Sequence, residues 1–300
     1  EGLRRKKKFC FLGSTDHHAG FPGSYGDGLT AVFAKEKSRQ AIWEALLAGK
    51  TYAVTGDRIL CDFSINGQGP GETVHGAVRE IRCVVRGEYW ADKIVLYKNC
   101  RPIKALCAEQ LIPGHSRKYK IRVEMGWGNS EDLTRWNGRI ETDGRMLQAN
   151  LYLRGRSLLS PTNHDGSPVE VNDIDNRVLE RAEQSFAWQC ETVRNKSTLH
   201  PQTDAAVVEI EGDLNTRVTV NVNGHIHEAT IAQLLDGGVS WHVKPYHSQA
   251  VKIHAAVPET EYEMVLETKD EPQDEVDIYH VEFAQKNGQW AFISPIYAVR

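Results

Sequence analysis

Residues 217–228 read Arg-Val-Thr-Val-Asn-Val-Asn-Gly-His-Ile-His-Glu, and this stretch shows in miniature how most of the chain is built. Valine alternates with polar residues from Arg217 to Val222, which is the period of a strand that buries one face. Asn223–Gly224 follows, a dipeptide that favours the tight turns of β-hairpins because both residues tolerate positive φ angles. The stretch therefore predicts a strand, a hairpin turn and a returning strand.

The same alternation recurs from about residue 59 to the end of the sequence. Further segments with a period of two are Ile59–Ile65, Glu80–Val85, Lys93–Tyr97, Lys118–Met125, Met146–Leu153, Ala206–Ile210, Val251–Val257, Glu261–Glu267, Tyr279–Gln285 and Trp290–Val299. Turn dipeptides of the same kind lie at Asn66–Gly67, Asn137–Gly138, Asp143–Gly144 and Asn287–Gly288. Many short strands joined by such turns predict an antiparallel β-sandwich. One helix is expected to interrupt it between Asp173 and Phe186, where apolar residues repeat every fourth position.

The first 58 residues carry a different pattern. Phe9–Leu12 is a short apolar run, typical of a buried strand in a parallel sheet, and a glycine-rich loop follows it. Ser38 can cap a helix with apolar residues at helical spacing, and Thr51–Val54 predicts a second strand. We therefore expect an α+β protein that is mainly β. Residues 1–58 would form a strand–loop–helix–strand segment, and residues 59–300 a β-rich, sandwich-like domain with room for two subdomains.

Composition and charge argue against several classes of function. The 300 residues are 40% hydrophobic and 25% charged, with a net charge of −4, as in ordinary globular proteins. The acidic balance predicts neither nucleic acid nor a membrane as a partner, and no stretch approaches the ~18 apolar residues of a membrane-spanning helix. Six scattered cysteines without a CxxC pair favour a reducing compartment such as the cytoplasm. Asn195–Lys196–Ser197 would instead be a glycosylation site in a secreted protein, so the localisation stays open. The sequence does not indicate the oligomeric state.

The clearest chemistry lies in Gly-Ser-Thr-Asp-His-His-Ala-Gly at residues 13–20, directly after the apolar run. Asp16 and His18, two positions apart at the carboxy end of a predicted strand, can point into one cleft. A carboxylate and an imidazole suit zinc, manganese or iron, and such a metal can generate hydroxide and stabilise a phosphoryl oxygen. On spacing alone, a polar loop in which Asp16 caps and His18 packs is the favoured interpretation.

The residues around this motif resemble the last βα segment of PHP-like metal-dependent hydrolases, a family named for polymerase and histidinol phosphatase domains. The resemblance is specific over Phe9–Ile59, through Ser-Thr-Asp-His-His, Pro-Gly-Ser and Ala-Leu-Leu-Ala-Gly-Lys-Thr-Tyr, and extends more loosely over most of the chain. It implies that residues 1–58 are the C-terminal βα remnant of a PHP-type (β/α) barrel. It also implies that Asp16 and His18 are metal ligands, and that His17 orients a ligand or faces the substrate.

The resemblance implies a function as well. The family carries a His-x-His near the start of its barrel, and nothing before Glu1 is present to supply it. The chain would then be the C-terminal portion of a divalent-metal-dependent hydrolase, a phosphoesterase acting on a small-molecule substrate, and inactive alone because most metal ligands lie upstream. Arg58 could contact an anionic group of that substrate, or form a structural ion pair. His225 and His227 share one face of their predicted strand, which allows an independent metal site or an exposed pair on a hairpin.

The alternative is a non-catalytic binding module. In that case the β-rich region is the working part and binds a carbohydrate or a protein partner. Its contact surface would be a group of exposed aromatic side chains on one sheet. The candidates are Trp127, Trp136, Trp188, Trp241 and Tyr246. Packing in the core is the competing interpretation for the same side chains.

Overall fold

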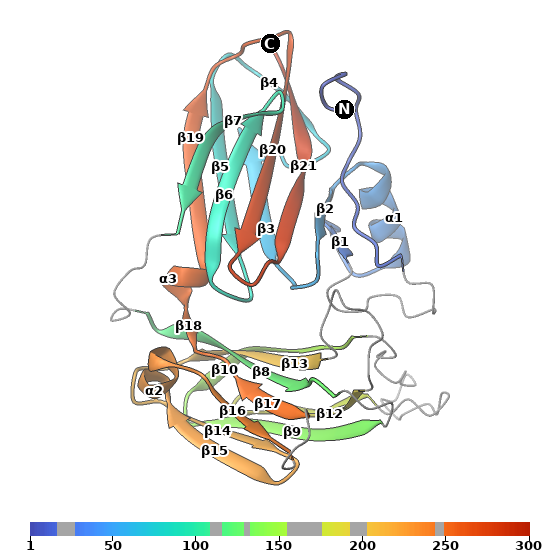
Figure 1. The fold of residues 1–300 in the computed structure, drawn as a ribbon. Coiled ribbons are helices and arrows are strands. Elements are labelled where there is room, and N and C mark those ends of the chain that lie inside the picture. The colour runs from blue at the N-terminus through green and yellow to red at the C-terminus, as the bar shows by residue number, and fades with distance from the viewer. Residues whose placement is uncertain (17–27, 109–115, 129–132, 155–175, 193–202, 244–248) are drawn as a thin grey trace. The chain divides into compact units, whose positions relative to one another are not determined.

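Strands make up most of the residues that the structure describes (Figure 1). The computed structural model describes residues 1–16, 28–108, 116–128, 133–154, 176–192, 203–243 and 249–300. They fall into two units: residues 1–15, 28–108 and 260–300 form the first, and Asp16 with the described residues between 116 and 259 forms the second. Among the helices of the described residues, none has the length and apolar character needed to cross a bilayer.

The first unit consists of two sheets on one core. Strands of the larger sheet are β1 (Leu29–Val32), β2 (Thr51–Val54), β4 (Thr73–His75), β6 (Ala91–Lys98), β7 (Arg101–Cys107), β20 (Val276–Gln285) and β21 (Trp290–Val299). Their order is β1-β2-β21-β20-β6-β7, with β4 parallel to β21 and every other pair antiparallel. The smaller sheet has the order β19-β5-β3, from β19 (Glu263–Asp270), β5 (Arg79–Arg86) and β3 (Leu60–Ile65). Helix α1 (Arg39–Leu47) links β1 to β2, and the short α3 (Glu259–Tyr262) precedes β19.

Alternate residues of these strands form the core of the first unit. Phe63 and Cys83 contribute from the smaller sheet, and Leu96, Phe283 and Ile293 contribute from the larger one, all at most 1% exposed. Burying a side chain of this size stabilises the folded state by about 1.5–3 kcal/mol relative to leaving it in water. The period of two in the sequence therefore arises because every second side chain is buried between the two sheets.

A buried ionic network crosses the same unit. Arg79 and Asp277 are both fully buried and ion-paired, and Arg79 Nη1 also donates to the Tyr279 hydroxyl at 2.8 Å. Burial alone would raise the pKa of Asp277. The backbone N–H of Gln273, the Arg79 guanidinium and Asn99 Nδ2 all donate to its carboxylate and together lower the pKa to about 2. The network thereby joins β5 and β20 to the turn between β6 and β7 and to the segment that precedes β20.

The second unit is also built from two sheets. One contains β8 (Lys118–Gly126), β10 (Arg145–Tyr152), β13 (Thr203–Glu211), β16 (Val239–His242), β17 (Ala250–Ile253) and β18 (Val257–Pro258). Its order is β10-β13-β8-β17-β16, with β18 beside β8. The other has the order β11-β12-β9-β14-β15, from β9 (Thr134–Thr142), β11 (Arg177–Arg181), β12 (Ser185–Thr192), β14 (Arg217–Val222) and β15 (His225–Thr230). Helix α2 (Ile231–Asp236) follows β15.

One apolar core joins the two sheets of the second unit. Ile121 and Val208 face it from the first sheet, and Ile140, Trp188 and Val220 face it from the second. The expectation of a mainly β protein with antiparallel sheets is confirmed in both units.

The expected turns are partly confirmed. Asn223 and Gly224 have φ angles of 52° and 83° and form the hairpin between β14 and β15. Asn287–Gly288 joins β20 to β21, and Asn66–Gly67 forms a turn in which the N–H of Ile65 donates to the carbonyl of Gln68. Asp143–Gly144 is a turn but not a hairpin, because β9 and β10 belong to different sheets.

The predicted turn at Asn137–Gly138 is wrong, since both residues lie inside β9. Gly138 is paired with Trp188 on β12, and a Cβ atom at this position would lie 2.0 Å from Trp188 Cζ2. Glycine therefore stands here to make room for an indole ring, and not to allow a positive φ angle.

The predicted helix between residues 173 and 186 is also wrong. Residues 173–175 lie outside the described residues, and Val178, Ala182 and Phe186 fall on β11, on the turn after it and on β12. The turn is closed by a hydrogen bond from the N–H of Ala182 to the carbonyl of Ser185. A spacing of four is a multiple of two as well as close to a helical turn, so it did not distinguish the two structures.

The segment Phe9–Leu12 is extended but belongs to no sheet, which corrects the prediction of a buried strand. Phe9 is 39% and Leu12 59% exposed. Side-chain hydroxyls hold the segment in place of a backbone ladder: Ser294 accepts from the N–H of Phe11, and Thr51 donates to its carbonyl. The strand before helix α1 is therefore β1 and not Phe9–Leu12. The helix connects β1 to β2, which are antiparallel neighbours and not two parallel strands.

The expected boundary at residue 58 also differs from the observed units. Residues on both sides of it belong to the first unit, because β2 pairs with β21 at the other end of the chain. This long-range pairing could not be read from local composition. Helix α1 and β1 therefore belong to the same unit as residues 59–108 and 260–300, which were expected to lie in the separate β-rich domain.

Replacing Gly138 by alanine should destabilise the protein. The added methyl group meets the buried ring of Trp188, and overpacking of this kind costs about 1–3 kcal/mol. Gly237→Ala is the matched control, because Gly237 is extended (φ 172°) and a Cβ atom added there would have no other atom within 4 Å. Urea unfolding followed by tryptophan fluorescence would measure both variants. Equal midpoints for the two variants would contradict the packing described for β9 and β12.

Candidate functional site

The predicted ligand Asp16 lies four residues after the extended segment Phe9–Leu12, and it is exposed. Its φ angle of 45° lies in the left-handed region, which aspartate adopts more readily than most residues. His17 and His18 lie outside the described residues. Within the part of the chain that the structure describes, no group of three or more His, Cys, Asp or Glu side chains could hold a metal ion. The metal assignment to Asp16 and His18 stays a prediction.

Arg58 is exposed just before β3, whereas the preceding residue Asp57 is fully buried. One carboxylate oxygen of Asp57 accepts hydrogen bonds from Gln285 Nε2 at 2.7 Å and Asn287 Nδ2 at 2.9 Å. Asp57 thus fastens the β20–β21 hairpin to the chain after β2. The role predicted for Arg58 at a substrate stays a prediction.

The aromatic residues proposed as a contact surface do not gather on one face. Trp136 and Trp188 are fully buried in the core of the second unit. Trp127 and Trp241 are half-buried, and Tyr246 lies outside the described residues. Core packing is therefore the correct interpretation for Trp136 and Trp188.

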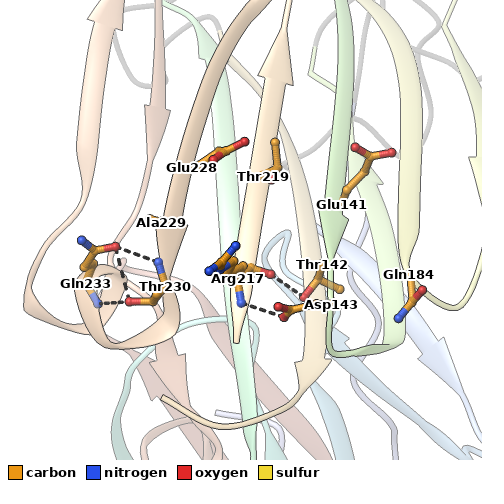
Figure 2. Close-up of a pocket in the computed structure, with 10 residues that line it drawn as sticks. All are labelled: Glu141, Thr142, Asp143, Gln184, Arg217, Thr219, Glu228, Ala229, Thr230 and Gln233. Carbon is orange, nitrogen blue, oxygen red and sulfur yellow. Dashed lines mark hydrogen bonds between the residues drawn. The ribbon is translucent and has the colours of Figure 1, made fainter. Parts of the chain in front are cut away.

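A polar groove lies on the outer face of the sheet β11-β12-β9-β14-β15 (Figure 2). Thr219 on β14 is directly opposite Glu141 on β9 and Glu228 on β15, so the three side chains form one row across three strands. The neighbouring inward-facing pair, Ile140 and Val220, is buried in the core, which places this row on the solvent side. The row results from strand alternation together with the register of the sheet.

The start of helix α2 forms one end of the groove. Thr230 caps this helix: its hydroxyl accepts from the N–H of Gln233, and Gln233 Oε1 accepts from the N–H of Thr230. At the other end, Asp143 Oδ1 accepts from the N–H of Arg217 at 2.7 Å, and the Thr142 hydroxyl donates to the Arg217 carbonyl at 2.8 Å. These bonds fix the backbone around a cavity of about 550 Å³.

The groove is acidic. Three carboxylates, from Glu141, Asp143 and Glu228, line it together with one guanidinium, from Arg217. Glu141 is partly neutralised by Arg139, whose Nε donates to it at 2.8 Å. Glu228 has no ion-pair partner among the residues that the structure describes. The groove therefore offers more hydrogen-bond acceptors than donors, and favours a ligand that donates hydrogen bonds.

A second polar group lies on the other sheet of this unit. His254 Nε2 and Glu124 Oε2 are 2.8 Å apart, and the Thr203 hydroxyl donates to Glu124 Oε1 at 2.6 Å. Burial raises the pKa of Glu124, but the hydrogen bonds from His254 and Thr203 outweigh it, so the pKa lies below its ordinary value. The Thr203 side chain is only 1% exposed, so a substrate cannot reach its hydroxyl. This arrangement stabilises β8 against its neighbours and is not that of an activated nucleophile.

Asp204 is a carboxylic acid of the second unit with a strongly raised pKa. It is fully buried, accepts from the N–H of Arg154 at 2.8 Å and lies beside the thiol of Cys190. Burial raises its pKa to about 8, because a buried charge is disfavoured more than these two donors can offset. Asp204 is therefore mostly neutral at physiological pH.

The sequence did not predict this groove, although it did predict one of the strands that form it. Arg217–Val222 was predicted as a strand, and Thr219 is one of its polar, outward-facing positions. The neighbours of Thr219 in the row come from 78 positions before it and 9 after it (219 minus 141, and 228 minus 219). The two-residue turn at Asn223–Gly224 fixes the pairing of Thr219 with Glu228, whereas only the register between β9 and β14 shows that Glu141 is beside Thr219.

Comparison with known proteins assigns no chemistry to this groove. A family model described as "Protein of unknown function (DUF3604)" matches residues 19–65. Within the described residues, that range covers β1, α1, β2 and β3 of the first unit. No curated protein matches the chain.

Stability should depend on pH through Asp204. The folded-state pKa of about 8 lies above the ordinary value of 3.8, so the folded state holds a proton that the unfolded chain releases. This contribution to stability is present below about pH 4 and is lost as pH rises to about 8, by up to about 6 kcal/mol. Asp204→Asn keeps an acceptor for Arg154 and should be the more stable protein at pH 8.

Unfolding free energies measured from pH 4 to pH 9 test this dependence. The difference between wild type and Asp204→Asn should grow with pH, whereas Asp236→Asn, a change at an exposed site in α2, should leave the wild-type profile unaltered. A constant difference between wild type and Asp204→Asn would show that Asp204 does not titrate in this range.

Proposed function

We propose that the second unit is a non-catalytic, sandwich-like module that binds a carbohydrate in its polar groove. The observation that carries this proposal is the row formed by Glu141, Thr219 and Glu228 on three adjacent strands. Neighbouring strands lie about 4.8 Å apart, so the row presents hydrogen-bonding groups over about 10 Å of a firmly paired sheet. Such a surface matches a ligand with several hydroxyl groups in sequence.

The chemistry of the lining residues supports a neutral, polyhydroxylated ligand. Sugar hydroxyls can donate to the carboxylates of Glu141 and Glu228, while Thr219 and the amide of Gln184 can both donate and accept, and Gln233 Nε2 can donate. The excess of carboxylates disfavours anionic ligands such as phosphoesters at this place. A cavity of about 550 Å³ is within the range typical of small-molecule sites.

Binding in this groove should be weak. None of the described residues that line it is aromatic, so a sugar ring gains no stacking surface there. Hydrogen bonds alone exchange water for protein partners and contribute little net free energy each. We expect a dissociation constant of about 1 mM, which corresponds to about −4 kcal/mol.

Alanine at Glu141 or Glu228 should weaken saccharide binding at least tenfold, because each change removes a charged acceptor whose hydrogen bond contributes about 1.5–3 kcal/mol. Ligand-detected NMR on the full chain, with a panel of neutral oligosaccharides, would measure the effect. Glu267→Ala is the matched control: Glu267 is an exposed strand carboxylate, ion-paired with Arg82 in the first unit. Equal binding by all three variants, or no binding by wild type, would contradict the proposal.

A second candidate is the divalent-metal-dependent hydrolase implied by the PHP resemblance, with Asp16 and His18 as ligands of Zn²⁺, Mn²⁺ or Fe²⁺ and a phosphoester as substrate. The observation that favours it is the backbone of Asp16. Asp16 is exposed, has a left-handed φ angle and directly precedes His17 and His18 in the sequence. His17 would orient a ligand or face the substrate.

If this second candidate is correct, the chain should bind Mn²⁺ weakly, and Asp16→Ala should abolish that binding. Two protein ligands leave most of the coordination shell to water, so turnover of an aryl phosphate should be slow or absent. Electron paramagnetic resonance of added Mn²⁺ measures binding directly, with Asp236→Asn as the control carboxylate change. Identical Mn²⁺ binding by wild type and Asp16→Ala would remove Asp16 from the metal site.

A further inference from the structure

Two histidines and a tryptophan meet at one open edge of the second unit. His225 and His227 lie on β15, the edge strand of its sheet, and Trp241 lies on β16, the edge strand of the other sheet. The His225 ring is stacked on the indole, with centroids 4.6 Å apart and planes 26° apart. The His227 ring lies 6.4 Å from the same indole at 27°.

The strand register explains why both imidazoles face this way. His225 pairs with Val222, and His227 pairs with Val220. Both valines are buried in the core, and residues directly opposite each other in an antiparallel pair share a face. The two histidines therefore lie on the inner face of β15, opposite to the face on which Glu228 lines the groove.

Their position at the edge keeps these inner-face side chains accessible. His225 is exposed and His227 is half-exposed, because no further strand follows β15 in its sheet within the described part of the chain. Trp241 is partly buried and packs against the core of the unit from the edge of the other sheet. The imidazoles consequently rest on a fixed apolar support and still reach water.

We propose that His225 and His227 form a surface chelate for a late divalent transition metal, with Cu²⁺ bound most tightly. Residues two apart on a strand are about 7 Å apart along the chain and point the same way, so their imidazoles can converge on one ion. Imidazole nitrogen is a preferred ligand of copper, nickel and zinc. A site with two ligands imposes little geometry, so its preference among metals follows the intrinsic order, in which Cu²⁺ is highest.

Stacking on Trp241 does not compete with this role. The nitrogen lone pairs that bind metals lie in the plane of the imidazole ring, whereas the indole contacts its face. The stacked arrangement restricts the side-chain rotamers before the metal arrives, which reduces the entropy lost on binding. The remaining coordination positions are left to water, so the site binds an exchangeable ion and does not hold the fold together.

The proposed copper site is separate from the carbohydrate-binding groove and from the metal site predicted at Asp16 and His18. It uses neither the outer face of β15, where Glu228 lies, nor Asp16 and His18. A copper site here could therefore exist whether or not the groove binds a carbohydrate.

Copper titration of the full chain, followed by electron paramagnetic resonance and tryptophan fluorescence, tests the proposal. His225→Asn and His227→Asn should each weaken the tightest Cu²⁺ site at least tenfold, and the double variant should lose one equivalent of bound copper. Trp241→Phe should keep the copper and lose most of the fluorescence quenching, because the reporting indole is gone. These changes are at exposed or half-exposed positions, and circular dichroism verifies that the variants fold.

His242→Asn is the matched control. His242 is an exposed histidine next to Trp241, on the opposite face of β16, and its loss should leave the copper affinity unchanged. His18→Ala should likewise retain this equivalent of copper. If the double variant binds as many equivalents as wild type with the same affinity, the chelate does not exist. Unchanged quenching in Trp241→Phe would also overturn the assigned geometry.

Discussion

Both units depend on one constraint: each sheet must bury one face against a second sheet and leave the other face to water. Strand alternation satisfies this constraint residue by residue, as in β14, where Val218, Val220 and Val222 are buried and the polar residues between them point outward. Because the inner face is closed by packing, chemistry can occur only on an outer face, at an edge or in a loop. The groove around Thr219 uses an outer face, and His225 and His227 use an edge.

The buried carboxylates show what a charged group needs in order to lie between two sheets. Arg79 and Asp277 remain charged between the sheets of the first unit because the carboxylate also accepts from Gln273 and Asn99. Asp204, with fewer donors around it, has a pKa raised to about 8 instead. The contrast follows from the number of hydrogen bonds each carboxylate receives, since an ion removed from water needs them to stay ionised. Neither group has access to a substrate, and both are explained by packing.

The outcome of the sequence interpretation differs from element to element for physical reasons. Asn223–Gly224 was correctly predicted as a hairpin because a two-residue turn is a local structure. Asn137–Gly138 has the same composition, but its glycine accommodates the ring of Trp188, which is 50 residues away (188 minus 138). Phe9–Leu12 is apolar like a buried strand, yet it is held by hydroxyl groups of Ser294 and Thr51. Local pattern predicts a strand well, and it does not tell whether a partner strand is present.

The sequence by itself determined the class of the fold, most strand positions and the location of several turns, because period and turn chemistry act over a few residues. It also singled out Asp16, His18, His225 and His227 as side chains able to bind a metal. Only the tertiary structure decided that β2 pairs with β21, that Trp136 and Trp188 are core residues, and that Glu141, Thr219 and Glu228 form one row. The physical reason is that strand order and register are set by contacts between distant segments, and one shift in register would turn every side chain of a strand to the other face.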